Sequence, residues 1–322
     1  MKRYTYKKGL LLLAILSLSS LSSAQKVEPI KFGDFEQWVT RDIKESAVLG
    51  GQVKRIYEIA PNGRFDGQRA YRNMGGSPWA TSNVMAKPSG IVKTNNTVYP
   101  AHHGHGLCAK LCTQMVECKA AGVINISVLA GGSIFLGELV EPVTSTKGPM
   151  SKMAQGIPFT RRPKALRFDY KFATSGAPNR IRETGFSKRT EVAGADMGEV
   201  ECYFQKRWED ADGCLHALRV GTMRTRFSKS TNDWLEAQDF TIHYGDITRQ
   251  SFYRDYMGLN NDSRAYYGRN SKGKVVKIIE EGWADPDETP THVMLRFTSS
   301  HGDAYIGSIG NTLWVDNIAW VF

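Results

Sequence analysis

Short segments in which apolar and polar residues alternate recur along this sequence, and their period of two constrains the fold more than any other feature. A strand places successive side chains on opposite faces of a sheet, so such a segment buries one face and exposes the other. Glycine, asparagine, aspartate and proline separate the segments. The pattern therefore predicts an all-β chain, folded as a sandwich or a barrel. The clearest segments are Leu166–Phe172, Val200–Phe204, Leu215–Val220, Phe240–Tyr244, Val293–Phe297 and Leu313–Phe322.

The N-terminus has the three parts of a secretory signal peptide. A basic stretch begins at Lys2, an apolar run extends from Leu10 to Leu18, and small residues follow up to Ala24. The apolar run is shorter than the roughly 18 residues that a membrane-spanning helix needs, and no later run reaches that length. We therefore expect residues 1–24 to be removed and the chain to have no transmembrane segment. The chain is then exported to the periplasm, to the cell surface or to the extracellular space.

Residues 25–322 contain no internal repeat, low-complexity linker or abrupt change of composition, and we expect a single domain over this range. The domain is longer than a minimal sandwich, so part of it must be elaboration. Turn signals such as Pro61-Asn62-Gly63 and Gly75-Gly76 gather at about residues 41–105. This stretch is predicted to be a loop-rich elaboration on one edge, where binding residues often lie.

The charge of the chain bears on its partners. The net charge is +10, and removal of residues 1–24 leaves 38 basic and 32 acidic residues, a net charge of +6. The basic residues are scattered, whereas a nucleic-acid-binding surface concentrates them in a stripe that includes aromatic residues. We therefore expect no nucleic-acid partner.

Five cysteines follow the predicted cleavage site, so at least one thiol is unpaired. Cys108 and Cys112 lie four residues apart in a strand-like run, about 13 Å, which is beyond the reach of a disulfide. We interpret most of the cysteines as small buried apolar side chains and leave the pairing open.

Glu199 and Glu201 are the candidate catalytic pair. Alternation places both carboxylates on one face of a strand together with Tyr203, about 6.6–6.8 Å apart. That separation falls within the roughly 6.5–9.5 Å of an inverting glycosidase. Any Glu-x-Glu on a strand gives the same spacing, so the alternative, which we prefer, is a solvated strand face without a catalytic residue.

Tryptophans are the candidate sugar-binding residues, because an aromatic ring packs against the apolar face of a pyranose while polar groups hold its hydroxyls. Trp79 and Trp283 follow turn residues and are expected to be exposed. Trp208 lies at a predicted hairpin end beside Arg207, which could bind a hydroxyl. The alternative for each tryptophan is a core position, since this residue type is usually buried.

The three histidines of His102-His103-Gly104-His105 could bind zinc or copper. Three imidazoles within four residues of a loop rarely converge on one ion, and a closed site needs further ligands. Exposed loop histidines are therefore the preferred interpretation.

Three regions of the sequence, in their order and spacing, resemble the "Putative carbohydrate metabolism domain" family, found mainly in exported proteins of Bacteroidetes. The resemblance implies an antiparallel jelly-roll β-sandwich, like that of carbohydrate-binding modules, with a role in glycan recognition or turnover. It implies no mechanism. The matching regions are Phe32–Trp38, then Val128–Gly137 with Gly156–Pro163 and Leu166–Phe172, and finally Thr298–Ser300 with Gly307–Ile318.

Jelly-roll carbohydrate-binding modules carry a Phe-Glu pair in their first strand and a Val-Asp pair in their last. The corresponding residues here are Phe35-Glu36 and Val315-Asp316. The resemblance therefore implies a structural Ca²⁺ held by Glu36 and Asp316, since calcium takes oxygen ligands. The alternative is that both carboxylates accept hydrogen bonds from backbone donors or pair with basic side chains.

From these observations we expect an exported glycan-binding protein, with an oligosaccharide or polysaccharide as its partner. The first alternative is a glycoside hydrolase or polysaccharide lyase on the same fold. The second is a structural or adhesive protein of the cell envelope, with protein partners there and no sugar ligand.

Overall fold

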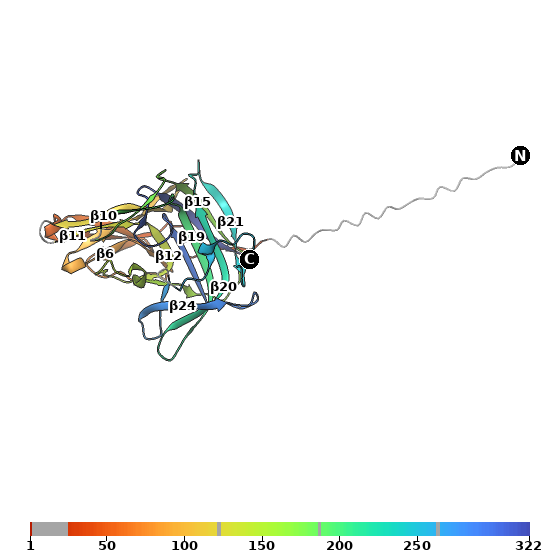
Figure 1. The fold of residues 1–322 in the computed structure, drawn as a ribbon. Helices are drawn as coiled ribbons and strands as arrows, with labels where there is room; N and C mark the ends of the chain where they lie inside the picture. The colour runs from red at the N-terminus through yellow and green to blue at the C-terminus, as the bar shows by residue number, and fades with distance from the viewer. Residues whose placement is uncertain (2–24, 121–123, 186–187, 262–264) are drawn as a thin grey trace.

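A computed structural model describes residue 1 and residues 25–120, 124–185, 188–261 and 265–322. The predicted signal peptide lies outside the described residues, apart from Met1. The all-β prediction is confirmed, because strands make up the regular structure apart from four short 3-10 turns. Figure 1 shows the strands stacked in layers, with the β10–β11 hairpin at the end far from β21. The turns are Ala47–Leu49, Pro88–Gly90, Pro149–Lys152 and Asp255–Met257.

The smaller of the two main sheets has six strands in the order β21-β15-β27-β9-β8, with β1 added alongside β27. Strand β27 therefore lies in the middle of the sheet, between β15 and β9. The strands are β1 (Val27–Pro29), β8 (Val98–His103), β9 (Gly106–Cys112), β15 (Ala165–Ala173), β21 (Leu235–Thr241) and β27 (Thr312–Val321).

The larger sheet has ten strands and closes on itself. Its order is β14-β25-β19-β20-β24-β23-β13-β12-β5, with β22 beside β20. Strand β12 also pairs with β25, so seven strands from β25 to β12 form a closed ring. The strands are β5 (Trp79–Thr81), β12 (Ser133–Leu139), β13 (Met153–Gln155), β14 (Ile157–Pro158), β19 (Gly198–Glu209), β20 (Leu215–Phe227), β22 (His243–Tyr244), β23 (Tyr267–Arg269), β24 (Val275–Trp283) and β25 (His292–Thr298).

The ring corrects the expectation of purely antiparallel sheets. Strand β20 runs parallel to β24, and β13 runs parallel to β23. The reason is the long connection after β20, which leads the chain back to start β24 in the same direction as β20. Among the described strands a jelly-roll order is therefore not evident, and the jelly-roll assignment stays a prediction.

The main hydrophobic core fills the space between the two sheets, as period-two alternation requires. Strand β15 contributes Leu166 and Phe168 from one side, and β19 contributes Val200, Cys202 and Phe204 from the other. The Phe168 ring meets Phe297 of β25 edge to face, with centroids 5.1 Å apart. Burial of these side chains, at about 25 cal/mol per Å² of apolar surface, holds the sheets together.

Residues 41–105 contain the end of strand β2 and strands β3 to β8, and turns and loops such as residues 67–78 separate these short strands. A loop-rich elaboration over this range stays a prediction. The remaining strands make four small sheets. These are β2 (Trp38–Lys44) with β3 (Val53–Ile59) and β4 (Gly63–Asp66); β6 (Val84–Ala86) with β7 (Lys93–Asn95); β10 (Gln114–Ala120) with β11 (Ile124–Ala130) and β17 (Thr184–Gly185); and β16 (Arg180–Arg182) with β18 (Thr190–Val192) and β26 (Ile306–Gly307).

Two further predictions can be checked here. The five cysteines are free thiols, and all but Cys214 are buried or half-buried. Within the described ranges, no helix is long and apolar enough to cross a membrane.

Trp79 is a residue of the main hydrophobic core. Its ring is 1% exposed, and its indole N–H donates to the Lys31 carbonyl at 3.0 Å. The expected exposure of Trp79 is therefore wrong: the residue opens strand β5, next to β12, and packs against Phe35 and Phe297. The turn that precedes it sets where the strand begins and leaves the ring in the core.

We predict that Trp79→Ala lowers the free energy of unfolding by about 3–5 kcal/mol, the usual cost of emptying a large aromatic site. Urea unfolding followed by circular dichroism measures it. The matched control is Trp208→Ala, because Trp208 is 44% exposed. A surface substitution changes stability by about 0.5 kcal/mol or less. Equal losses in the two variants would contradict the core assignment.

Candidate functional site

Strand β19 carries a row of charged side chains on the face that points away from the main core. Glu199 and Glu201 alternate with the core residues Val200 and Cys202, as the sequence predicted. Both carboxylates are nevertheless buried, with residue exposures of 0% and 2%. The expected solvated face is therefore wrong, because this face lies inside the closed ring, where neighbouring strands and the loop before β23 cover it.

Three arginines from the flanking strands converge on these two carboxylates. The register places Arg226 of β20 opposite Glu199, and Arg224 of β20 and Arg296 of β25 on either side of Glu201. Opposite charges on cross-strand neighbours attract over short distances, so the register alone brings the five side chains together. We call these five residues the arginine cluster.

The ion pairs of the arginine cluster are short. Arg224 reaches both carboxylates, with Nε 3.0 Å from Glu199 Oε1 and Nη2 2.6 Å from Glu201 Oε1. Arg226 Nε lies 2.6 Å from Glu199 Oε1, and Arg296 Nη2 lies 2.5 Å from Glu201 Oε2. Each carboxylate is therefore held by two guanidinium groups, which compensates the cost of burying its charge.

These contacts decide what the two glutamates can do chemically. Burial alone would raise the pKa of Glu199, but Arg224 and Arg226 outweigh it and lower the pKa to about 2. A general acid needs a raised pKa so that it holds a proton at neutral pH. Glu199 lacks that property, and the Glu201 oxygens face guanidinium groups instead of a substrate. In this geometry Glu199 and Glu201 are the acidic partners in a structural ion-pair cluster.

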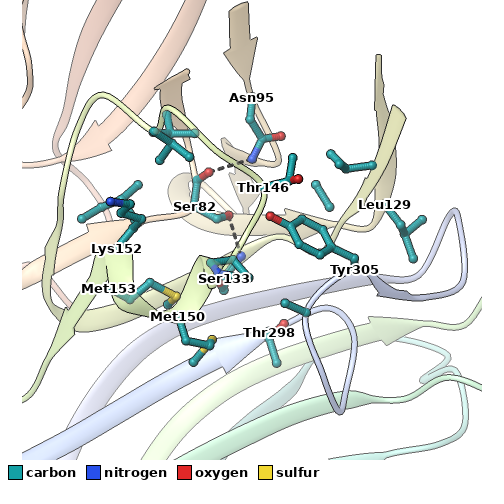
Figure 2. A pocket seen from close by; sticks show the side chains of 18 of the residues that line it. Ser82, Asn95, Leu129, Ser133, Thr146, Met150, Lys152, Met153, Thr298 and Tyr305 are labelled. Atoms are coloured by element: carbon teal, nitrogen blue, oxygen red, sulfur yellow. Dashed lines mark hydrogen bonds between the residues drawn. The ribbon is translucent and has the colours of Figure 1, made fainter. Parts of the chain in front are cut away.

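A cleft with a volume of about 470 Å³ opens above the arginine cluster. Glu201, Arg224 and Arg296 are among its lining residues, and we call this part of the lining the floor. The walls come from β11, β12, the segment before β13 and the loop after β25, and Figure 2 shows residues of these walls. The volume is within the range of small-molecule and sugar sites. Other residues that line it include Ser82, Lys93, Asn95, Leu129, Ser133, Phe135, Thr146, Met150, Lys152, Asn260, Tyr266, Thr298, Asp303 and Tyr305.

One wall of the cleft is polar and rigid. The Asn95 amide donates to the Ser82 carbonyl at 2.8 Å, and the Ser133 backbone N–H donates to Ser82 Oγ at 2.9 Å. Figure 2 draws both bonds as dashed lines between residues that come from separate parts of the chain. Such a network fixes hydroxyl and amide groups in place at the edge of the site.

Tyr305 is the aromatic residue that enters the cleft from the opposite side. Figure 2 shows its ring directed into the pocket, toward the side that carries Ser82. Its backbone has a φ of 65°, an unfavourable conformation for a bulky side chain. Strain of this kind persists only where the surroundings impose it, and it is common at ligand sites. Burial raises the pKa of Tyr305 to about 12, so its phenol stays a hydrogen-bond donor at neutral pH.

Several buried polar atoms at the cleft have no hydrogen-bond partner among the described residues. The donors are Nε of Arg296 and the amide nitrogen of Asn260, and the acceptors are Oδ1 of Asn95 and the two carboxylate oxygens of Glu201, which are held in ion pairs. Asn260 is only 2% exposed, and its backbone N–H is held by Glu280 at 2.9 Å. A buried donor without an acceptor costs free energy, and such groups are candidates for ligand contact.

The predicted sugar-binding residues do not lie in this cleft. Trp79 is in the core, Trp283 is half-buried at the end of β24 with the Arg219 guanidinium 5.6 Å from its ring centroid, and Trp208 is exposed. The Trp208 ring stacks on His216 at 5.5 Å, and the residue lies near the end of β19 that leads into β20, so the predicted hairpin end is confirmed. A binding role for Trp208 or Trp283 stays a prediction.

Arg207 does not accompany Trp208, because alternation sends the two side chains to opposite faces of β19. Its Nη1 donates to the Gln155 carbonyl at 3.0 Å, and its Nε donates to Gln205 Oε1 at 2.8 Å. Burial inside the ring lowers the pKa of Arg207 to about 9. The two side chains therefore do not share one surface, and a binding role for Arg207 stays a prediction.

The residues proposed for Ca²⁺ do lie in one neighbourhood, at β9 and β27. Glu36 Oε1 accepts the Leu107 backbone N–H at 2.9 Å, and Asp316 Oδ2 is 2.7 Å from His103 Nδ1. Asp316 Oδ1 also accepts the N–H of Asn317. These contacts are the kind that the alternative to metal binding predicted. Over the described part of the chain, no group of three or more histidine, cysteine or acidic residues is arranged to hold a metal ion.

The expectation of exposed loop histidines holds in part: His102 and His105 are exposed, but only His105 lies in a turn. His102 and His103 end strand β8, and only Gly104 and His105 form the turn. Strand alternation directs His102 and His103 to opposite faces, so the three imidazoles do not converge. His103 stacks instead on Trp234, with ring centroids 3.7 Å apart.

Comparison with known protein families identifies the family of this chain. The model of the family described as "Putative carbohydrate metabolism domain" matches residues 34–251, and the chain belongs to this family. No curated protein matches the sequence.

Two solved structures resemble the fold. One, described as a putative glycoside hydrolase from Bacteroides thetaiotaomicron, is 16% identical with a TM-score of 0.42, over 85% of this chain and 76% of that one. The other, described in the same words and from Bacteroides vulgatus, is 13% identical with a TM-score of 0.41, over 92% and 95%. Neither likeness bears on the activity of this chain.

We predict that Glu199→Gln lowers the free energy of unfolding at pH 7 by about 3–5 kcal/mol, because Arg226 then lacks its buried partner. The lowered pKa gives the sign of the pH dependence. The stabilisation by Glu199 is complete above its ordinary pKa of 4.5 and is lost as the pH falls toward 2.

The measurement is guanidinium unfolding of wild type and variant from pH 7 down to pH 2, where the two stabilities should approach each other. Glu117→Gln is the control, since Glu117 forms an exposed pair with Lys119. A difference that stays constant over this pH range would contradict the ion-pair assignment.

Proposed function

We propose that this chain is an exported glycan-binding protein that holds its ligand in the cleft above the arginine cluster. Membership of the family supports a role in carbohydrate metabolism. The observation that carries the proposal is the cleft itself, whose wall presents the Tyr305 ring and whose floor presents the unpartnered amide of Asn260. An aromatic surface with a few fixed polar groups is the combination that a pyranose needs.

The state of the ionisable groups favours binding over hydrolysis. Both glutamates of the arginine cluster are ion-paired, and Arg224 and Arg226 lower the pKa of Glu199, which is the opposite of what a proton donor needs. Asp303 is the other carboxylate among the residues lining the cleft, and it lies exposed at the rim. An inverting hydrolase needs two carboxyl groups that face each other across the sugar. The glutamates instead share one strand face and point at arginines.

A polysaccharide lyase is the runner-up, because a tyrosine beside arginines is present at the floor. A lyase needs a base to remove a proton from the sugar ring. Burial raises the pKa of Tyr266 well above its usual value, so its phenol keeps its proton at neutral pH. Tyr266 is therefore a poor base in this geometry.

The glycan-binding proposal predicts that Tyr305→Ala weakens glycan binding by about tenfold or more, within the range expected when an aromatic contact is lost from a binding site. The experiment screens the mature chain on a glycan array and measures the hits by calorimetry. Trp314→Ala is the control, because Trp314 is a half-buried aromatic residue of β27 outside the cleft.

The same samples separate the alternatives. Release of reducing ends or unsaturated sugars from the bound polysaccharide would support a hydrolase or a lyase. Binding to envelope proteins without binding to any glycan would support a structural or adhesive role. Equal glycan affinity of Tyr305→Ala and wild type would remove the cleft from the proposal.

Export and calcium complete the proposed function. We propose that residues 1–24 direct the chain to the periplasm or the cell surface, and fractionation of cells that express the full sequence tests this.

For calcium, the expected result is a lower melting temperature in EGTA for wild type and no change for Asp316→Asn. An unchanged melting temperature of wild type would leave Glu36 and Asp316 with their protein partners alone.

A further inference from the structure

We propose that the cleft binds glycans that carry an anionic group, either a carboxylate or a sulfate ester, and that Arg296 and Asn260 contact this group. The inference rests on the proposed glycan-binding function and adds the chemical class of the ligand. It depends on the charge of the cleft and on the hydrogen-bonding groups that the folded chain leaves open.

The arginine cluster is not neutral. Three guanidinium groups share two carboxylates, which leaves one positive charge without a partner inside the cluster. Burial opposes the charge of Arg224 and Arg296, but the attraction of Glu201, Glu199 and nearby tyrosines outweighs it and raises the pKa of both arginines. A charge in this position is costly unless an anion or water compensates it, and the cleft is the open side of the cluster.

The surplus charge can be assigned to Arg296 from its contacts. Arg224 is bound to both glutamates and to the Tyr256 carbonyl, so its donors are largely used. Arg296 has one short contact, to Glu201, and its Nε has no partner among the described residues. Its side chain is 14% exposed, so it retains access to the cleft.

Asn260 supplies a second donor at the same site. Its amide nitrogen is buried and unpartnered within the described part of the chain, and the residue lines the cleft with Arg296. A carboxylate or sulfate has several acceptor oxygens and can use an arginine and an amide together. Hydrogen bonds to an ionised group are roughly twice as strong as neutral ones.

The rim of the cleft has the same sign. Lys93 and Lys152 line it, against the single exposed carboxylate of Asp303. Lys93 also pairs with Glu45 at 3.2 Å, and the excess of basic over acidic groups at the site persists with this pair included. A low-dielectric cleft lined by one sign of charge raises the local concentration of oppositely charged ligands.

The rest of the lining distinguishes a sugar-borne anion from a free one. A free sulfate or phosphate ion would fill a small part of a 470 Å³ cleft and would leave the Tyr305 ring and the polar wall at Ser82 without contacts. A pyranose with an acidic substituent uses all three features. The ring packs on Tyr305, the hydroxyls meet the polar wall, and the anion reaches Arg296.

The test measures binding of matched glycans to the mature chain by calorimetry. One pair is oligogalacturonate and its methyl ester, which differ in the carboxylate charge. The other is chondroitin sulfate and unsulfated chondroitin oligosaccharides, which differ in the sulfate. We expect the more highly charged member of at least one pair to bind about tenfold or more tightly, and the pair that responds identifies the anion.

Two variants test the assignment to residues. Arg296→Gln removes the surplus charge and leaves two arginines facing two glutamates, so the fold should persist. Asn260→Ala removes an amide nitrogen that has no partner, and it tests the site independently of the arginine cluster. Both should reduce the preference for the charged glycan while binding of the uncharged member is retained. Arg64→Gln is the control, because it removes a positive charge from a side chain that is 75% exposed and outside the cleft.

Each result has a distinct meaning. Equal binding of both members of both pairs by wild type would overturn the anionic ligand while leaving glycan binding intact. Absence of binding to these glycans and to every glycan on the array would overturn the proposed function as well. A charge preference that survives in Arg296→Gln and Asn260→Ala, or that is lost equally in Arg64→Gln, would overturn the assignment to this cleft.

Discussion

Strand β19 is buried on both of its faces, so its charged side chains must find partners inside the protein. The rest of the structure depends on this requirement. Its even-numbered residues, such as Val200 and Cys202, are apolar and join the core between the sheets. Its odd-numbered residues include Glu199 and Glu201, which would be unstable in that position alone. The ring of strands places arginines opposite them, so the burial of charge becomes a set of ion pairs.

The closed ring gives this charged interior its shape. Apolar and aromatic side chains, including Tyr203, Met294 and Ile278, fill part of the ring beyond the arginine cluster. The cleft remains at the end where Arg296 and Thr298 of β25 meet the segment that precedes β13. The site therefore rests on paired strands at its floor, while its walls combine strands β11 and β12 with connecting segments, one of which carries Tyr305. A rigid floor with variable walls is a common arrangement for binding sites.

The sequence predicted the parts of the fold that depend on local periodicity. Strands such as β15, β19 and β27 lie where alternation placed them, and the inward direction of Val200 and Phe204 is confirmed. What alternation cannot reveal is whether the polar face meets water or another part of the chain. Glu199 looks the same in either case, and the partners that bury it are distant in sequence. The Arg224-Thr225-Arg226 spacing held a usable signal, because it mirrors Glu199-Val200-Glu201 on the next strand.

The candidate site was harder to predict than the fold for the same reason. Tyr305 and Asn260 lie in irregular segments, where no period marks them, and their importance comes from a cleft assembled by distant strands. Tryptophan positions were a weaker guide, because turn-type residues precede both Trp79 and Trp283 in the sequence, yet Trp79 opens β5 in the core and Trp283 ends β24 half-buried. Turn residues determine where a strand begins, whereas the pairing of that strand determines whether its first side chain is covered.

The position of β27 in the middle of the smaller sheet has a consequence for how the chain folds. Its neighbours β9 and β15 have no other strand between them, so both carry an unpaired edge until residues 312–321 arrive. Contacts between segments so far apart in sequence form slowly, and exposed strand edges are prone to pair with other molecules. The edges of β9 and β15 are therefore open to pairing with other chains until β27 arrives, and β27 covers both of them when it closes the sheet.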